Sequence, residues 1–81
     1  MSITDFATYI ISGIVKNPDM VKASVFEGDE DTTILEILVS NDDMGVVIGK
    51  QGKNAKALRT IINAHAYLND IKKIKINIDS F

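Results

Sequence analysis

The sequence has no cysteine and no tryptophan, and it contains a single proline among 81 residues. Without cysteine there is no disulfide framework and no cysteine metal site, which suits a reducing compartment. Long apolar runs are also missing: no stretch reaches the roughly 18 apolar residues of a membrane span, and Asp5, Thr8 and Ser12 interrupt the N-terminal segment. We therefore expect one soluble, cytoplasmic domain over residues 1–81.

Acidic residues are missing from one part of the chain. The segment from Met44 to Asn69 contains four cations and no acid, whereas the rest carries five cations and eleven acids. The formal net charge of −2 argues against a generic basic nucleic-acid binder, but the charge is polarised along the chain. The segment is either the charged face of an ordinary amphipathic helix or a surface that attracts an anionic ligand. Its cations are Lys50, Lys53, Lys56 and Arg59.

The N-terminal segment has the periodicity of an amphipathic helix. Apolar residues recur at three- and four-residue steps from Ile3 to Val15. Ser2 and Asp5 resemble a capping box at its start, and Asn17-Pro18 supplies a stop signal.

Three segments are typical of β-strands: residues 21–27, 32–39 and 72–79. The first two are rich in β-branched residues and are separated by "GDED", which predicts a hairpin turn. Alternation assigns one residue in two to the buried face of the sheet. These residues are Val21, Ala23, Val25, Leu35, Ile37, Val39, Ile74, Ile76 and Ile78.

Two further helical segments lie between the second and third strands, at residues 41–48 and 53–68. The first begins with capping and acidic residues, as a helix N-terminus favours. The element order is then α-β-β-α-α-β, an α+β fold in which three helices pack on one face of a three-stranded sheet. In the longer helix we expect five residues to face the core: Leu58, Ile61, Ile62, Ala64 and Leu68.

Gly49-Lys50-Gln51-Gly52, here called the glycine turn, joins these two helices. A nucleoside-triphosphate loop needs G-x-x-x-x-G-K-[ST] after a strand; here the spacing differs, and Gln51 stands where a hydroxyl is required. On spacing alone the turn could be no more than a helix end, since glycine adopts left-handed angles without steric cost. A third interpretation is a clamp on a nucleic-acid backbone, because G-x-x-G exposes backbone at a helix N-terminus that favours anions.

The segment "DDMGVVIGKQGKNAKALRTI" resembles the KH motif, with the glycine turn as its GXXG loop. The element order is similar to the type II KH arrangement, and the whole chain resembles the small bacterial KH proteins of the KhpA (YlqC) family. The resemblance implies that the glycine turn meets phosphates, that nearby lysines add attraction and that apolar neighbours face the bases. The implied RNA-binding residues are Val47, Ile48, Gly49, Lys50, Gln51, Gly52, Lys53, Ala55 and Lys56.

The resemblance implies binding of single-stranded RNA without catalysis, as an RNA chaperone or post-transcriptional regulator with links to cell shape. It also implies a homodimer, and a heteromer with a larger KhpB-like protein that contains a KH domain. No cofactor is implied. An alternative is a KH-fold protein-interaction module with weak or vestigial RNA binding.

Three features predict weak and salt-sensitive binding. The family commonly has a basic residue at Val46 and a larger aliphatic residue at Ala55. The acidic stretch Glu27–Asp31 corresponds to the KH variable loop and would repel RNA if it lies near the groove.

The remaining polar residues do not indicate an enzyme or a metal site. His65 is the only histidine, and with no nucleophile pattern beside it we expect a packing or surface role. Asp42 and Asp43 fit helix capping better than an EF-hand. On the sheet face away from the helices we expect three exposed apolar residues, a plausible site of association with another chain: Phe26, Ile34 and Leu38.

Overall fold

The computed structural model describes all residues from 1 to 81, and its helices and strands follow the predicted order. No helix in it is both long enough and apolar enough to cross a bilayer. Short 3₁₀ turns connect several of the elements. The helices are α1 (Ile3–Ser12), α2 (Met44–Ile48) and α3 (Lys53–Leu68), and the strands are β1 (Lys22–Glu27), β2 (Thr33–Val39) and β3 (Ile74–Ser80).

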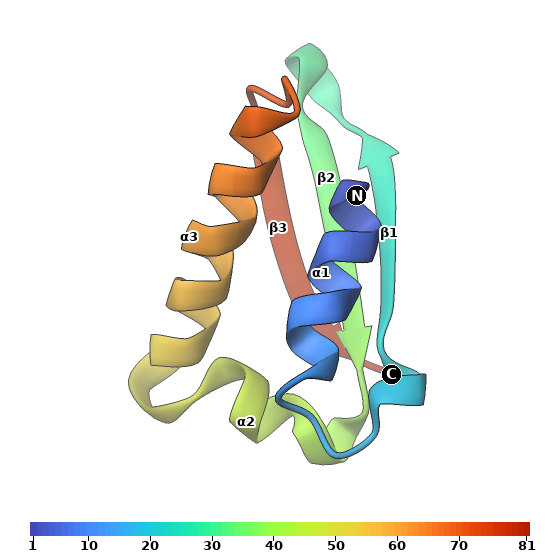
Figure 1. The fold of residues 1–81 in the computed structure, drawn as a ribbon, viewed down its shortest axis with the longest axis vertical. Helices are drawn as coiled ribbons and strands as arrows, with labels where there is room; N and C mark the ends of the chain where they lie inside the picture. The colour runs from blue at the N-terminus through green and yellow to red at the C-terminus, as the bar shows by residue number, and fades with distance from the viewer.

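The three strands form one sheet in the order β1-β2-β3, with β2 in the centre. β1 pairs antiparallel with β2 from Lys22↔Leu38 to Glu27↔Thr33, which confirms the predicted hairpin. β3 pairs parallel with β2, as the long helical crossover between them requires. Helices α1 and α3 lie over one face of the sheet, and α2 closes the end of the layer between them (Figure 1).

The core lies between this sheet face and the helices. Central strand β2 alternates between buried and half-buried residues along its length, as a strand with one covered face should. Val25 departs from the prediction, because it lies on edge strand β1 and is 45% exposed. The core cluster consists of Ile3, Ala7, Ile11, Val21, Leu35, Ile37, Val39, Val47, Leu58, Ile62, Ala66 and Ile76.

Helix α1 is shorter than its apolar pattern predicts. Ser2 caps it as expected, since its hydroxyl accepts a hydrogen bond from the Asp5 N–H at 3.2 Å. The helix ends at Ser12 and not at Val15, because Gly13 follows and the Ile14 N–H bonds back to the Ile11 carbonyl at 3.0 Å. Ile14 is left 42% exposed.

The buried face of α3 is narrower than predicted. Leu58 and Ile62 are buried as expected, but Ile61, Ala64 and Leu68 are exposed, and that part of the prediction is wrong. The buried positions that the pattern missed are Ala55 and Ala66. Both are small residues, and α1 and α3 contact each other over the sheet.

Candidate nucleic-acid interface

The glycine turn lies at the junction of α2 and α3, at one end of the molecule (Figure 1). Three of its four residues have positive φ: Gly49 at 76°, Gln51 at 58° and Gly52 at 75°. L-residues with a side chain rarely adopt such angles. The turn therefore folds back sharply enough to place the start of α3 beside the end of α2.

The two glycines meet different structural needs. A Cβ on Gly49 would lie 2.6 Å from the Cγ of Asn54 and 2.8 Å from its backbone nitrogen, so no side chain fits there. A Cβ on Gly52 would meet nothing within 4 Å. Gly49 is thus required by packing inside the protein. Gly52 leaves bare backbone facing open space, where a ligand can approach closely.

Hydrogen bonds within the backbone hold the turn, including one from the Lys53 N–H to the Lys50 carbonyl, and leave the start of α3 without a side-chain cap. The Gly49 N–H donates to the Gly45 carbonyl at 2.9 Å, and the Gly52 N–H donates to the Gly49 carbonyl at 3.1 Å. No side chain caps the N-terminus of α3, where Gly52 is the N-cap residue. The first-turn N–H groups of this 16-residue helix therefore sit at the positive end of its dipole, which favours an anion.

The side chains around the turn combine exposed cations with exposed apolar groups. Lys50, Lys53 and Lys56 are exposed, and so is Gln51. Beside them, Val46 is 43% exposed and Ile48 is 39% exposed.

Two of the nine predicted site residues lie beneath this surface. Val47 has no exposed surface and Ala55 is 5% exposed, so their side chains are not part of the exposed surface around the turn. Val47 belongs to the core cluster. The two residues support the surface from below, because α2 and α3 each turn one face toward the sheet.

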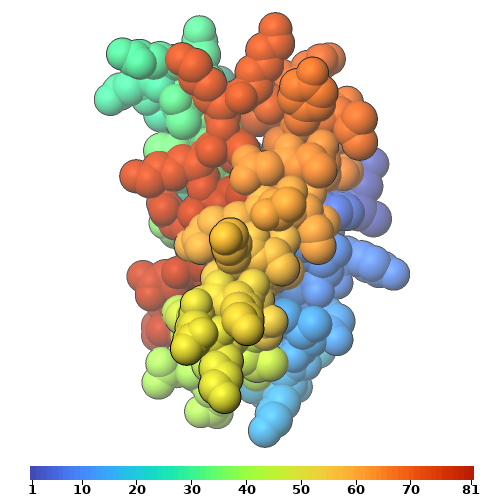
Figure 2. All heavy atoms as spheres, turned by 90° about the vertical axis from the view of Figure 1, so that its left-hand side faces the viewer, coloured from blue at the N-terminus to red at the C-terminus, as the bar shows by residue number.

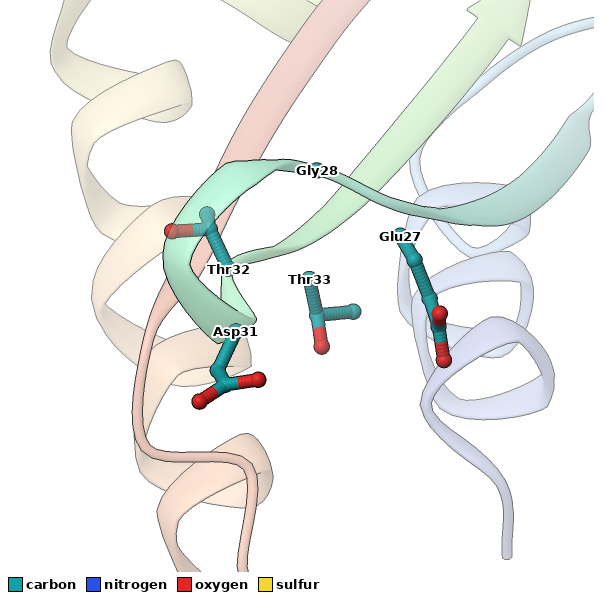
Figure 3. A pocket seen from close by; sticks show the side chains of 5 residues that line it. All are labelled: Glu27, Gly28, Asp31, Thr32 and Thr33. Atoms are coloured by element: carbon teal, nitrogen blue, oxygen red, sulfur yellow. The ribbon is translucent and has the colours of Figure 1, made fainter.

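The acidic hairpin, Glu27–Asp31, lies far from the glycine turn. The two occupy opposite ends of the long axis in both Figure 1 and Figure 2, and the molecule is 34 Å long. The carboxylates of Glu27 and Asp31 border a polar hollow of about 180 Å³ with Thr33 (Figure 3). The expected repulsion of a ligand at the glycine turn therefore does not hold, since the hairpin is at the other end of the sheet.

The structural role of Asp43 differs from the one that the sequence predicts. We expected a helix cap, but its side chain is 1% exposed and reaches the segment after α1. Its carboxylate accepts hydrogen bonds from the backbone N–H groups of Lys16 and Asn17, each at 3.0 Å, and from the Asn17 side chain at 3.1 Å. The segment before α2 is thereby tied to the chain that leaves α1.

These contacts also set the pKa of Asp43. Burial by itself raises the pKa of the carboxyl group, because it disfavours the charged form. The hydrogen bonds from Lys16 and Asn17, together with the nearby Lys16 charge, outweigh burial and hold the pKa below its ordinary value.

His65 has the packing role expected from the sequence. Its ring stacks on Phe6 with centroids 4.1 Å apart, and its Nε2 lies 3.1 Å from the Met1 carbonyl oxygen. The acidic side chains and this histidine form no group of three that could hold a metal ion.

Comparison with known protein families identifies the family of this chain. The family model described as the KH domain of KhpA/KhpB matches residues 4–78. The chain belongs to the KhpA/KhpB KH-domain family. The resemblance predicted from the glycine turn and its flanking helices is thus confirmed.

Relatives in this family include proteins named RNA-binding protein KhpA. The one from Clostridium acetobutylicum is 45% identical over 69 residues, which cover 85% of this chain and 89% of the relative. The one from Borreliella burgdorferi is 45% identical over 58 residues, 72% of this chain and 70% of the relative. The one from Thermotoga maritima is 38% identical over 69 residues, 85% of this chain and 88% of the relative.

A solved structure shares the fold. The structure is Era in complex with MgGDPNP and nucleotides 1506–1542 of 16S ribosomal RNA, and it matches with a TM-score of 0.67 at 16% identity. The match covers 96% of this chain but 29% of the Era chain. This match supports a KH fold for the present chain, and at this identity it carries no information beyond the fold.

Proposed function

We propose that the chain binds single-stranded RNA, without catalysing a reaction, by holding the RNA backbone at the glycine turn. The observation that carries this proposal is Gly52, whose bare backbone faces open space at the uncapped N-terminus of a helix. The acid-free segment around it supports the same conclusion. So do the names of the relatives, each an RNA-binding protein.

In this proposal each part of the surface has a distinct role. The N–H groups at the start of α3 and the ammonium groups of Lys50 and Lys53 bind phosphates, with Lys56 one turn further on. Gln51 lies at the exposed tip of the turn. The exposed apolar side chains of Val46 and Ile48 offer contact to bases. Because sequence-specific RNA recognition targets unstacked bases, the ligand is single-stranded.

The affinity is expected to be modest and dependent on salt. The cations near the turn neutralise roughly two to four phosphates, so log K falls with log salt by a slope of about 1.4 to 2.8. Val46 adds no charge where a cation could contact phosphate. The acidic hairpin is not expected to weaken RNA binding at the glycine turn, because it lies at the far end of the molecule.

The biological role follows as a finer proposal. The chain acts in the cytoplasm as an RNA chaperone or post-transcriptional regulator, with a link to cell shape, as its family resemblance implies. It forms a homodimer and pairs with a larger KhpB-like protein. An apolar stripe on the outside of α3 supports self-association; it consists of Ala57, Ile61, Ala64 and Leu68, all exposed.

The stripe fits a second copy of the same helix in antiparallel orientation. Its spacing of four, three and four residues is that of a two-helix seam, and its alanines permit close approach. Ile61 is 47% exposed and Leu68 is 81% exposed. The cations Lys53, Lys56 and Arg59 lie in the first half of α3. Antiparallel pairing keeps the cations of one copy away from those of the other, and it leaves the glycine turn of each copy free.

A pair of charge-matched variants tests the RNA proposal. Lys50→Asp adds an acid at the glycine turn, and Lys72→Asp makes the same charge change in the exposed loop after α3. Fluorescence anisotropy with a random-sequence single-stranded RNA pool should give about tenfold weaker binding for K50D, with K72D within about twofold of the wild type. Equal affinities of K50D and wild type, with the fold intact by circular dichroism, would overturn the proposal.

A further inference from the structure

Asn54 joins the two helices that flank the glycine turn. It is the second residue of α3, and its Nδ2 donates a hydrogen bond to the Val46 carbonyl oxygen at 2.7 Å. Val46 is in the last turn of α2, where carbonyl groups lack a partner inside their own helix. The hydrogen bond therefore satisfies a free carbonyl of α2 from the start of α3, across the turn.

The same side chain also packs directly against the turn. The space that a Cβ on Gly49 would occupy lies 2.6 Å from the Asn54 Cγ and 2.8 Å from the Asn54 Cβ. Asn54 thus restricts the conformation of the turn in two ways. Its side chain packs against Gly49, and its Nδ2 donates a hydrogen bond to the Val46 carbonyl oxygen. It is exposed and lies outside the core cluster, so its removal leaves the core packing intact.

We propose that Asn54 is a positioning residue of the RNA-binding turn. Its side chain fixes α2 against α3 and so holds the Gly52 backbone and the first N–H groups of α3 in the geometry that receives phosphate. RNA then does not need to order the turn as it binds, which lowers the cost of association. Because its side-chain amide is bonded to Val46, Asn54 acts through the turn and not by contact with RNA. This inference rests on the proposed function.

The test compares Asn54→Ala with Asn63→Ala. Asn63 is an exposed asparagine in the middle of the same helix, so both variants remove the same side-chain amide and neither changes the charge. With the same random-sequence RNA pool, N54A should bind about fivefold to tenfold more weakly, and N63A should bind like the wild type. The slope of log Kd against log salt should be the same in all three proteins.

A measurement on the free protein separates positioning from general destabilisation. In N54A, amide hydrogen exchange should become faster at Lys50–Lys53, while exchange in central strand β2 stays as in the wild type. Uniformly faster exchange throughout the chain would instead assign Asn54 a purely structural role and overturn the proposal.

The other outcomes are equally distinct. Wild-type affinity in N54A, or the same loss in N63A, removes the positioning role. A shallower salt slope in N54A would mean that the variant had lost a contact between a lysine and a phosphate, which positioning of the turn backbone does not predict and which contradicts the proposal. If K50D binds like the wild type, the RNA proposal itself fails, and that result does not depend on N54A.

Discussion

Gly49 and Gly52 have almost the same φ, yet their surroundings differ. Gly49 packs against the first turn of α3, and Gly52 faces open space. The G-x-x-G spacing alone identifies neither role, because both glycines match the motif equally well. The first glycine of the turn therefore allows close packing against α3, and the second leaves the backbone accessible to a ligand.

Alanine at these two positions should have unequal effects on stability. Gly52→Ala meets the left-handed backbone penalty alone, about 1 kcal/mol. Gly49→Ala combines a clash with Asn54 and a backbone conformation (φ 76°, ψ 172°) that essentially only glycine adopts, for a total of about 3 kcal/mol. Urea unfolding followed by circular dichroism gives both values. Losses of equal size would contradict the assignment of packing to Gly49.

Asp43 should make the stability of the protein depend on pH in the acid range. Its pKa is lowered in the folded state from an ordinary 3.8, so the folded protein binds the proton less readily than the unfolded chain. The stabilisation is present above pH 3.8 and is lost as the pH falls through the lower folded pKa. Asp43→Asn should reduce the acid dependence of the urea midpoint relative to the wild type. An unchanged dependence would show that other carboxyl groups cause it.

At the scale of elements, periodicity predicted the order of helices and strands, because each amphipathic element keeps one apolar face. It failed at one helix face, that of α3. In α3, Ile61 and Leu68 fit an inward stripe by composition but are exposed, and the buried face of the helix consists of Ala55, Leu58, Ile62 and Ala66. In α2, Val47, which the family resemblance implies as an RNA-binding residue, is a member of the core cluster. Which side of a short helix is buried depends on its neighbours, and that information is not local.

The partners of Asp43 and Asn54 could not be predicted for the same reason. Asp43 bonds to residues 26 and 27 positions away in the chain. Asn54 bonds across the turn to Val46, eight positions earlier. Asp43 was predicted to cap a helix, because aspartate is common at helix starts, and the sequence assigned no role to Asn54.

The outward stripe of α3 leads to a prediction about association. Leu68→Glu should convert a dimer into a monomer while the protein stays folded, because it places a charge at an apolar seam. Sedimentation velocity measures the change. Phe26→Glu is the companion variant on the open sheet face, where Phe26 is 53% exposed. A monomer from F26E and a dimer from L68E would locate the interface on the sheet instead.

The whole molecule is an acidic protein in which the cations of the Met44–Asn69 segment lie at the glycine turn and in the first half of α3. The cations of the Met44–Asn69 segment start at the glycine turn, and the acidic hairpin is at the opposite end. With a molecular length of 34 Å, this separation exceeds the Debye length of about 8 Å at physiological salt. The net charge of −2 therefore says little about the field that a ligand meets at the turn.

Neutralising the acidic hairpin should leave RNA binding nearly unchanged. The combined variant Asp29→Asn, Glu30→Gln and Asp31→Asn is expected to bind RNA within about twofold of the wild type at physiological salt. Fluorescence anisotropy with the random-sequence RNA pool measures it. An affinity gain of about tenfold or more would mean that the hairpin approaches the bound RNA.

The most direct test of the central claim is the footprint of RNA on the protein. In an amide-resolved NMR titration with single-stranded RNA, the account predicts that the largest shift changes fall on Gly49–Ala55, with the acidic hairpin and the open sheet face unaffected. Changes centred on the open sheet face or on the acidic hairpin, with Gly49–Ala55 silent, would contradict it.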